Sequence, residues 1–284
     1  MISPVWACHR CRTALQKIRD SFACPRCGFE MSVKAGYFDA GDPLKISFPA
    51  ERRDHLAAIE REHFWFSPRD TLLAEILNRI APPARRIVEL GCGTGRFISI
   101  LQGPAELIMG VDAFENSIQA AASTGKEAVW LRGDLCAMPV ADESFDVAVS
   151  MDVLEHVEPG PFLSEARRIV HNDGLLLLSV PAGRFLWSDA DTAAGHRCRY
   201  TVKMLSGELT MNGWRMLGYT YYQFFLYPLM MLSRAVLKAK VRAERHPPVS
   251  LNRFFRAVNT AEVRLFSRAC LPFGSSLVMW AKKA

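Results

Sequence analysis

Apolar residues occur along this chain in short runs, and helix-patterned or polar segments separate these runs. Ile87, Val88 and Leu90 form the first central run, a pattern typical of a strand buried in a parallel sheet. Comparable runs predict further strands over 107–112, 128–134, 144–152, 175–180 and 214–222. Helical patterns lie between them at 97–101, 161–170 and 201–211. This alternation predicts an α/β fold with a mostly parallel sheet, closed by an antiparallel seventh strand at 276–280.

The region before the first central strand has the helical period. A charged helix is expected over 51–62 and an amphipathic helix over 71–80, with Ser67 as its N-cap and Pro68 in its first turn. The turn-rich stretch 36–43 is interpreted as a linker.

A heavily apolar segment with a basic flank occupies 223–270, between the sixth and seventh strands. Pro228 and the polar flanks leave it too short for a membrane-spanning helix. Nine Lys/Arg and two acids fall in 233–268, a net charge of +7, so the rest of the chain carries −1 of the total +6. The basic character is therefore local, which argues against a nucleic-acid partner. The insert is either a helical hairpin that covers a pocket or a peripheral membrane element at 223–245.

The chain has 284 residues, half of them hydrophobic, enough for one large α/β domain over 51–284 and a small module. Its first twenty residues carry cysteines and charges where a secretory signal has an apolar core, so we predict a cytoplasmic location. Two C-x-x-C pairs, Cys8/Cys11 and Cys24/Cys27, stand twelve residues apart. This spacing predicts a structural zinc-ribbon module over 1–50, the alternative being four unligated thiols.

Three glycines at alternate positions, Gly91, Gly93 and Gly95, follow the first central strand. A strand, a Gly-rich turn and a helix N-terminus let the backbone approach a ligand closely. The dinucleotide-binding spacing fails, because its third glycine would fall at Arg96, and no P-loop is present. Asp112 ends the next strand, where a carboxylate can accept hydrogen bonds from both ribose hydroxyls.

The order of these features resembles that of the class I S-adenosylmethionine-dependent methyltransferases. The resemblance rests on the E-x-G-x-G-x-G turn beginning at Glu89, on Asp112, on Gly133-Asp134 and on the D-x-L-E-H block at 152–156. It covers about residues 60–221 and the last strand. It implies a Rossmann-like seven-stranded sheet and in-line transfer of a methyl group from a sulfonium to a nucleophile.

The resemblance also implies which residues contact the cofactor. Glu89 would organise the glycine turn, Asp112 would take the ribose hydroxyls, and Asp134 would face the adenine amino group, with Leu135 beside the ring. The other implied contacts are Gly91, Cys92, Gly93, Gly95, Ala113, Met151 and Trp65. Trp65 belongs to an aromatic element at 63–69 that resembles a lid over the cofactor, a packing staple against the sheet being the other interpretation.

Two histidines follow the carboxyl ends of strands, where open α/β sheets bind ligands. His156 stands in a tight loop, and His196 stands on a longer loop rich in arginine. The stretch 195–201 resembles the G-H-x-R-R-Y-T sequence of a methyltransferase subgroup common in bacterial small-molecule, lipid and glycan pathways, with Cys198 inside it. We expect His196, and after it His156, to act as the catalytic base or to position the acceptor, a structural role being the alternative.

The block at 152–156 also resembles that of ubiquinone-type O-methyltransferases, in which such residues can hold a divalent ion. Asp152, Glu155 and His156 match this pattern. We favour the interpretation that Glu155 and His156 shape the pocket without a metal, because three ligands from one loop need not converge.

Three functions follow from these observations. The first is methyl transfer, to oxygen or alternatively to carbon, of a small-molecule, lipid-linked or glycan acceptor. The second is methylation of a ribosomal-RNA base, in a group that also carries an N-terminal zinc module; the uneven charge and the lack of an N-P-P-Y-type run argue against it. The third is a non-catalytic zinc-bearing adaptor, against which the intact Glu89, Asp112 and Asp134 argue.

Overall fold

The computed structural model describes residues 5–41, 60, 62–81, 84–101, 105–237 and 247–284, without the side chains of 234–237. Most of the charged helix expected over 51–62 lies outside the described residues, as do the module boundary at residue 50 and the basic residues between 238 and 246.

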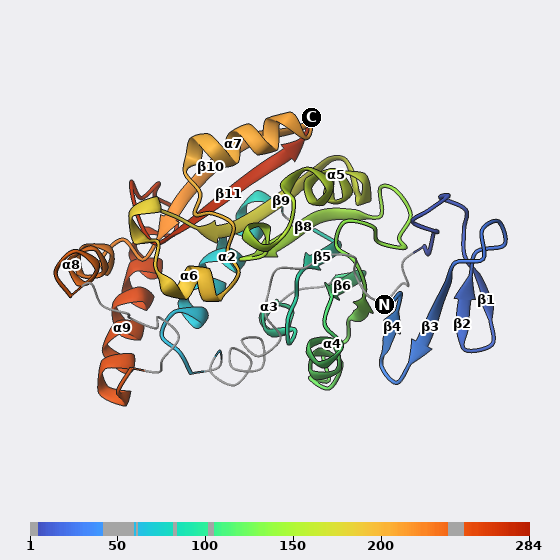
Figure 1. Ribbon diagram of the computed structural model, residues 1–284, viewed down its shortest axis with the longest axis horizontal. Helices are drawn as coiled ribbons and strands as arrows, with labels where there is room; N and C mark the ends of the chain where they lie inside the picture. The colour runs from blue at the N-terminus through green and yellow to red at the C-terminus, as the bar shows by residue number, and fades with distance from the viewer. Residues whose placement is uncertain (1–4, 42–59, 61, 82–83, 102–104, 238–246) are drawn as a thin grey trace.

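One mixed sheet of eleven strands organises the described part of the chain (Figure 1). Its strands, in their order across the sheet, are β1 (Gln16–Ile18), β2 (Ser21–Ala23), β3 (Glu30–Lys34), β4 (Tyr37–Asp39), β7 (Val129–Arg132), β6 (Leu107–Asp112), β5 (Arg86–Leu90), β8 (Phe145–Met151), β9 (Val170–Pro181), β11 (Ser276–Lys283) and β10 (Trp214–Tyr222). The strands from β7 to β9 run parallel, and β11 lies antiparallel between β9 and β10, which confirms the expected closing strand. The predicted number of seven is wrong, because the N-terminal strands extend the sheet.

Strand β4 joins the N-terminal strands to the main sheet. It pairs antiparallel with β3 and parallel with β7, where Phe38 is the partner of Leu131. The interpretation of 36–43 as a linker is therefore wrong. Tyr37 and Asp39 are buried, and Gly36, with a positive φ of 86°, supplies the tight turn that made the stretch resemble a loop.

The helices lie on both sides of the sheet. They are α2 (Phe66–Ile80), α3 (Arg96–Ile100), α4 (Glu115–Ala122), α5 (Pro159–Ile169), α6 (Asp189–Ala193), α7 (Val202–Met211), α8 (Tyr227–Leu237) and α9 (Val249–Phe266), with 3₁₀ turns η1 (Leu154–His156) and η2 (Arg184–Leu186). The predicted N-cap of α2 is wrong: the helix begins at Phe66, Trp65 is its N-cap, and no side chain caps it. Pro68 still lies in the first turn, where a missing N–H breaks no helical hydrogen bond.

Successive residues of the central strands enter two different cores, because side chains alternate across a sheet. Val88 packs with residues of α5, α7 and the N-terminal strands, whereas Ile87 packs with residues of α2, α3, α4 and α9. Both faces are thus covered, which explains why the central strands are apolar throughout.

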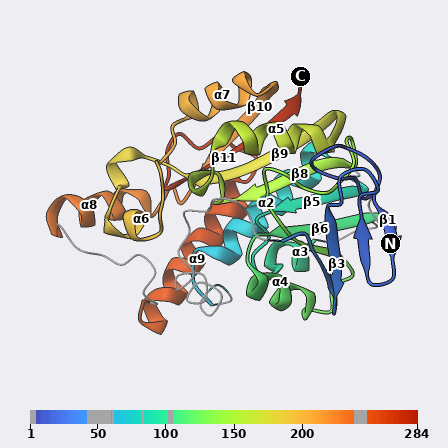
Figure 2. The same ribbon diagram turned by 45° about the vertical axis from the view of Figure 1, so that its right-hand side comes forward.

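The two additions to the central domain lie at opposite ends of the molecule, as both views show (Figures 1 and 2). Strands β1 to β4 extend one edge, and α8 and α9 of the insert lie at the other end beside α6. No helix among the described residues is long and apolar enough to cross a bilayer.

Candidate functional site

The glycine turn lies at the carboxyl end of β5. Gly91, Gly93 and Gly95 all have positive φ, 80°, 53° and 77°, a conformation that side chains disfavour. At Gly95 a Cβ would also come within 2.6 Å of the Trp130 ring. The turn therefore needs glycine both for its backbone conformation and for its close packing on β7.

Asp112, the last residue of β6, is bonded to this turn. Its Oδ2 accepts from the Gly93 N–H at 2.9 Å, and its Oδ1 accepts from the Phe114 N–H at 2.9 Å. The neighbouring Ala113 is buried. The ends of β5 and β6 thus form one hydrogen-bonded edge, which spacing along the chain did not predict.

The other predicted cofactor residues lie along the same end of the sheet or directly behind it. After β7, Asp134 Oδ1 accepts from the Cys136 N–H at 2.8 Å, and Leu135 is buried. Met151 ends β8 and is buried. Cys92 is buried too, and burial raises the pKa of its thiol well above the ordinary value, so it is a packing residue and not a nucleophile.

Glu89 lies at the base of the glycine turn with an exposed fraction of 2%. Its Oε2 has no hydrogen-bond partner among the described residues. Burial, and after it the charge of Asp70, raises the pKa of Glu89 well above its usual range.

A buried ion-pair network lies beside this edge, and the sequence analysis did not identify it. Arg69 contacts Asp70 at 2.8 Å and also pairs with Asp152, while Arg96 contacts Asp70 at 2.7 Å. The Arg69 guanidinium also lies 4.4 Å from the centre of the Trp65 ring. The only sequence signal would have been charged residues beside an aromatic element, which is weak.

The two candidate catalytic histidines come together. Their ring centres are 4.9 Å apart in a T-shaped arrangement, although His156 follows β8 and His196 follows α6. The Arg197 N–H donates to the Glu155 carbonyl at 2.9 Å, which links the two loops. Chain order alone places these histidines forty residues apart.

His196 has a carboxylate partner that sequence reasoning missed. Its Nδ1 lies 2.9 Å from Oδ1 of the buried Asp191, which Arg199 Nε also contacts at 2.8 Å. Oδ2 of Asp191 accepts from Ser188 in the capping box of α6. Burial alone would raise the pKa of Asp191, but the His196 hydrogen bond and the Arg199 charge lower it to about 2. The ionised Asp191 can therefore accept a hydrogen bond from Nδ1–H, a tautomer that leaves a lone pair on Nε2.

Glu155 is fully buried next to both histidines. Neither of its carboxylate oxygens has a hydrogen-bond partner among the described residues. Burial, followed by the charge of Asp152, raises the pKa of Glu155 well above its usual range. One ligand atom each from Glu155, His156 and His196 lies within 4.8 Å of the others, whereas Asp152 pairs with Arg69.

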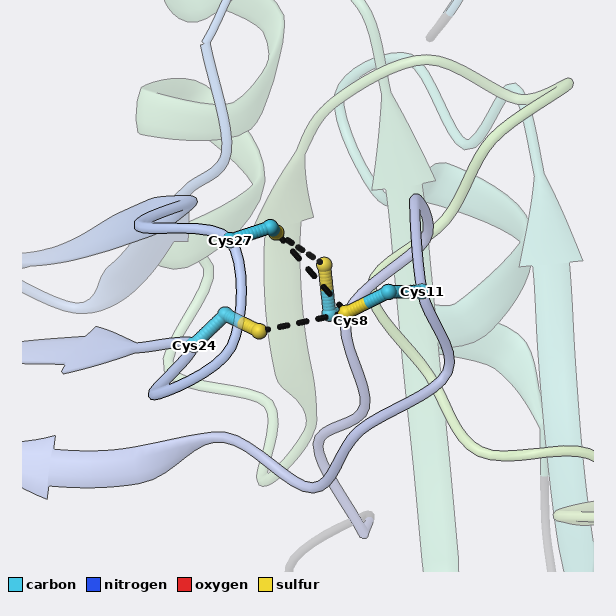
Figure 3. A group of neighbouring side chains, drawn as sticks. All are labelled: Cys8, Cys11, Cys24 and Cys27. Carbon is cyan, nitrogen blue, oxygen red and sulfur yellow. Dashed lines mark hydrogen bonds between the residues drawn. The ribbon is translucent and has the colours of Figure 1, made fainter.

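The second cluster consists of four cysteines, two before β1 and two between β2 and β3 (Figure 3). Cys8 Sγ lies 3.4 Å from Cys27 Sγ, and Cys11 Sγ lies 3.3 Å from Cys24 Sγ. All four sulfurs lie within 4.8 Å of one another, and no disulfide joins them. Four converging thiols are the ligand set of a closed structural zinc site, so the residues present fit that ion.

Comparisons with known proteins agree with this geometry. Residues 88–178 match the family described as "Methyltransferase domain". A protein of Mycolicibacterium smegmatis named "Probable S-adenosylmethionine-dependent methyltransferase" is 27% identical over 145 residues. The aligned part covers 50% of this chain and 56% of that protein. A candidate 23S rRNA (guanine-N(1)-)-methyltransferase of Bacillus subtilis is 26% identical over 191 residues, 58% of this chain and 66% of that protein.

Solved structures show the same fold. A methyltransferase of Thermotoga maritima, described as a possible histamine N-methyltransferase, has a TM-score of 0.54 at 19% identity, covering 82% of this chain and 95% of that one. The [4+2]-cyclase SpnF has a TM-score of 0.53 at 19% identity, covering 77% and 82%. The fold thus hosts more than one reaction, and only the site can indicate the reaction.

These findings indicate the class of the domain. Residues 88–178 match a methyltransferase domain, and relatives named as S-adenosylmethionine-dependent methyltransferases support the conclusion that the protein is an enzyme. The chain spans about half the length of the mycobacterial relatives that it matches, so their similarity does not say what the whole protein acts on.

Proposed function

We propose that this protein transfers a methyl group from S-adenosylmethionine to an oxygen of a small-molecule, lipid-linked or glycan acceptor, with carbon as the alternative nucleophile. The observation that carries the proposal is the Asp191–His196 pair, 2.9 Å between Oδ1 and Nδ1, on the long loop after β9. A hydroxyl is a poor nucleophile until its proton leaves. A neutral imidazole held by a carboxylate can receive that proton on Nε2.

The cofactor residues act through their own geometry in this proposal. The glycine turn brings backbone N–H groups close to the methionine part, while Asp112 accepts hydrogen bonds from the ribose hydroxyls. An ionised carboxylate can accept more than two hydrogen bonds, so those from Gly93 and Phe114 are compatible with this role. Asp134 and Leu135 recognise the adenine, and Trp65 forms part of the wall. S-adenosylmethionine supplies the electrophilic methyl group, and the protein supplies orientation and proton removal.

Cofactor affinity should depend on Asp112. Replacing Asp112 with Ala removes charge-assisted hydrogen bonds, each contributing about 1.5–3 kcal/mol, so S-adenosylmethionine binding should weaken by about 2–4 kcal/mol. Calorimetric titration measures this change. The exposed Glu127→Gln is the control and should bind as the wild type does. An unchanged affinity for Asp112→Ala would exclude the ribose role.

The cysteine cluster predicts one structural zinc ion per chain, detectable by elemental analysis of reduced protein. Chelation should raise amide hydrogen exchange in β1 to β4, because these short strands have little apolar core of their own. The central strands β5, β6 and β8 should keep their protection, since their burial does not depend on the ion. A freshly purified, reduced protein without metal at the four cysteines would contradict the zinc-ribbon interpretation.

His196→Ala should lower turnover by about 10²–10⁴, the usual contribution of a general base, while cofactor affinity stays near that of the wild type. The matched control is His171→Ala, at the start of β9 and outside the cluster, which should keep wild-type turnover. Full activity of His196→Ala would remove the base from the mechanism and leave proximity as the catalytic device.

The insert supports a further part of the proposal, a peripheral contact with an anionic membrane. Arg253, Arg256 and Arg264 line a shallow groove along α9 that contains no acid. Large apolar side chains are also exposed on α9, namely Leu251, Phe254 and Leu265, and on α8, namely Leu229 and Leu232. Apolar residues flanked by arginines suit the interface of an anionic lipid bilayer.

Co-sedimentation with vesicles that contain anionic lipid should therefore be strong at low salt and weak at high salt. Each arginine near the surface contributes about 1 kcal/mol, so Arg256→Gln should lower the partition coefficient about fivefold. Arg215→Gln, exposed on β10 away from the groove, is the control. Absence of binding at low salt would favour a hairpin that only covers the domain.

Methylation of ribosomal RNA is the second candidate, favoured by the name of the Bacillus subtilis relative. One labelling experiment distinguishes the two candidate functions. The protein is incubated with S-adenosylmethionine that carries a labelled methyl group, together with either bacterial lipid and glycan extracts or bacterial ribosomal RNA. Label in the lipid or glycan fraction supports the first candidate. Label in RNA, with strongly salt-dependent RNA binding, supports the second.

A further inference from the structure

We infer that Glu155, His156 and His196 form a binding site for a divalent transition-metal ion, separate from the cysteine cluster. One ligand atom from each of the three lies within 4.8 Å of the other two. Two of the residues belong to η1, and the third lies beyond α6. The inference rests on the proposed function only for the role of the ion, because binding of the ion can be measured without an acceptor.

The two loops that carry these ligands are held together by other bonds. The Arg197 N–H donates to the Glu155 carbonyl at 2.9 Å, and the Tyr200 hydroxyl donates to the Leu154 carbonyl at 3.4 Å. Tyr200 itself is buried. The convergence is therefore built into the packing of the loops and does not depend on mobile surface side chains.

Glu155 supplies the evidence that a ligand belongs here. It is fully buried, and neither carboxylate oxygen has a hydrogen-bond partner among the described residues. The arginines nearby have other carboxylates: Arg199 contacts Asp191, and Arg69 contacts Asp70 and Asp152. Buried carboxyl groups are normally hydrogen-bonded, paired or metal-bound, so this one lacks a partner that a cation would supply.

His196 is oriented as a metal-ligating histidine usually is. Its Nδ1 bonds to Asp191, and Asp191 is in turn held by Arg199 and Ser188. A carboxylate on one imidazole nitrogen directs the lone pair of the other nitrogen toward an ion. With Nδ1 engaged by Asp191, Nε2 is the nitrogen of His196 that remains to bind an ion.

The donor set selects the kind of ion. Two imidazoles and one carboxylate are the ligands of many catalytic zinc sites, which keep an open position, whereas Mg²⁺ and Ca²⁺ prefer oxygen ligands alone. Bonds of about 2.0–2.2 Å require ligand atoms about 3.4 Å apart, so the three side chains must close slightly around the ion. At its open position such an ion lowers the pKa of a bound hydroxyl. Ion binding would occupy the Nε2 lone pair that a base uses, so the two roles of His196 are alternatives.

The test uses the full chain in reduced form. One sample is loaded with zinc at the cysteines and titrated with Zn²⁺, and a parallel sample is stripped of metal and titrated with Co²⁺. The wild type should bind two ions per chain. Cobalt at the cysteines gives sulfur-to-metal charge-transfer absorption, and cobalt at the new site gives none, so the two sites can be distinguished. Glu155→Gln and His196→Gln should each weaken the second ion at least tenfold. Asp191→Asn should weaken it about 10–100-fold, as loss of an orienting partner does.

His171→Gln is the matched control and should keep both ions. Because Glu155→Gln changes a buried residue, thermal melting checks its fold, and His196→Gln tests the same site from a partly exposed loop. One ion per wild-type chain, or a second ion that both variants bind normally, would overturn the inference. Neither result bears on the methyl-transfer proposal, which the labelling of lipid and glycan extracts against ribosomal RNA tests separately.

Discussion

The carboxylate of Asp112 fixes the conformation of the backbone at the carboxyl ends of β5 and β6. It accepts the Gly93 and Phe114 N–H groups, and the N–H groups of Gly91 and Cys92 donate to the Val111 carbonyl. A turn with three left-handed glycines has many conformations in a free chain, and ordering them opposes folding. The bonds to β6 order the turn in the absence of any ligand, so a cofactor that binds there does not lose affinity to that ordering.

The N-terminal strands depend on the same sheet. Lys34 contacts Glu115 at 2.7 Å, and Arg132 contacts Asp39 at 3.1 Å, so ion pairs accompany the pairing of β4 with β7. Trp6 packs against Phe38, with ring centres 4.7 Å apart. Strand β7 would otherwise be an exposed sheet edge, which proteins usually cover. The N-terminal strands therefore form a layer that covers this edge of the central sheet and are not a separate unit on a tether.

Sequence periodicity predicted the central elements because each is decided locally. Strands β6 and β10 coincide with the predicted 107–112 and 214–222, and the other central strands shift by one to a few residues. Strand β9 shows the limit: it begins at Val170, not at 175. Its polar 171–174 stretch interrupts the pairing with β8, which passes from Val170 to Leu175, and Asp173 has a positive φ of 70°, so the predicted turn lies inside the strand. Strand β4 was missed because three residues next to a glycine become a strand only by pairing with β7.

The candidate site likewise has a part that the sequence predicts and a part that it does not. The glycine turn, Asp112 and Asp134 can be predicted from spacing, since each lies at or close to the carboxyl end of a strand that the pattern predicts. The contacts of Asp191 with His196 and of Asp70 with Arg96 join residues through loop and helix packing that no period records. The convergence of His196 with Glu155 depends on how two separate loops meet, so the sequence suggested only the three ligands of one loop.

The ion pairs beside the edge bear on the two interpretations of the aromatic element. The Trp65 ring is stacked by Arg69, whose guanidinium is bound to Asp70 and Asp152, and the Trp65 carbonyl accepts from the Tyr222 hydroxyl at 2.8 Å. Opening this element as a lid would require the Trp65 carbonyl to leave the Tyr222 hydroxyl and the Trp65 ring to leave the Arg69 guanidinium. Because Arg69 is itself held by Asp70 and Asp152, it gives the ring a fixed surface to pack on. These contacts favour the interpretation of the described part of the element as a packing staple against the domain.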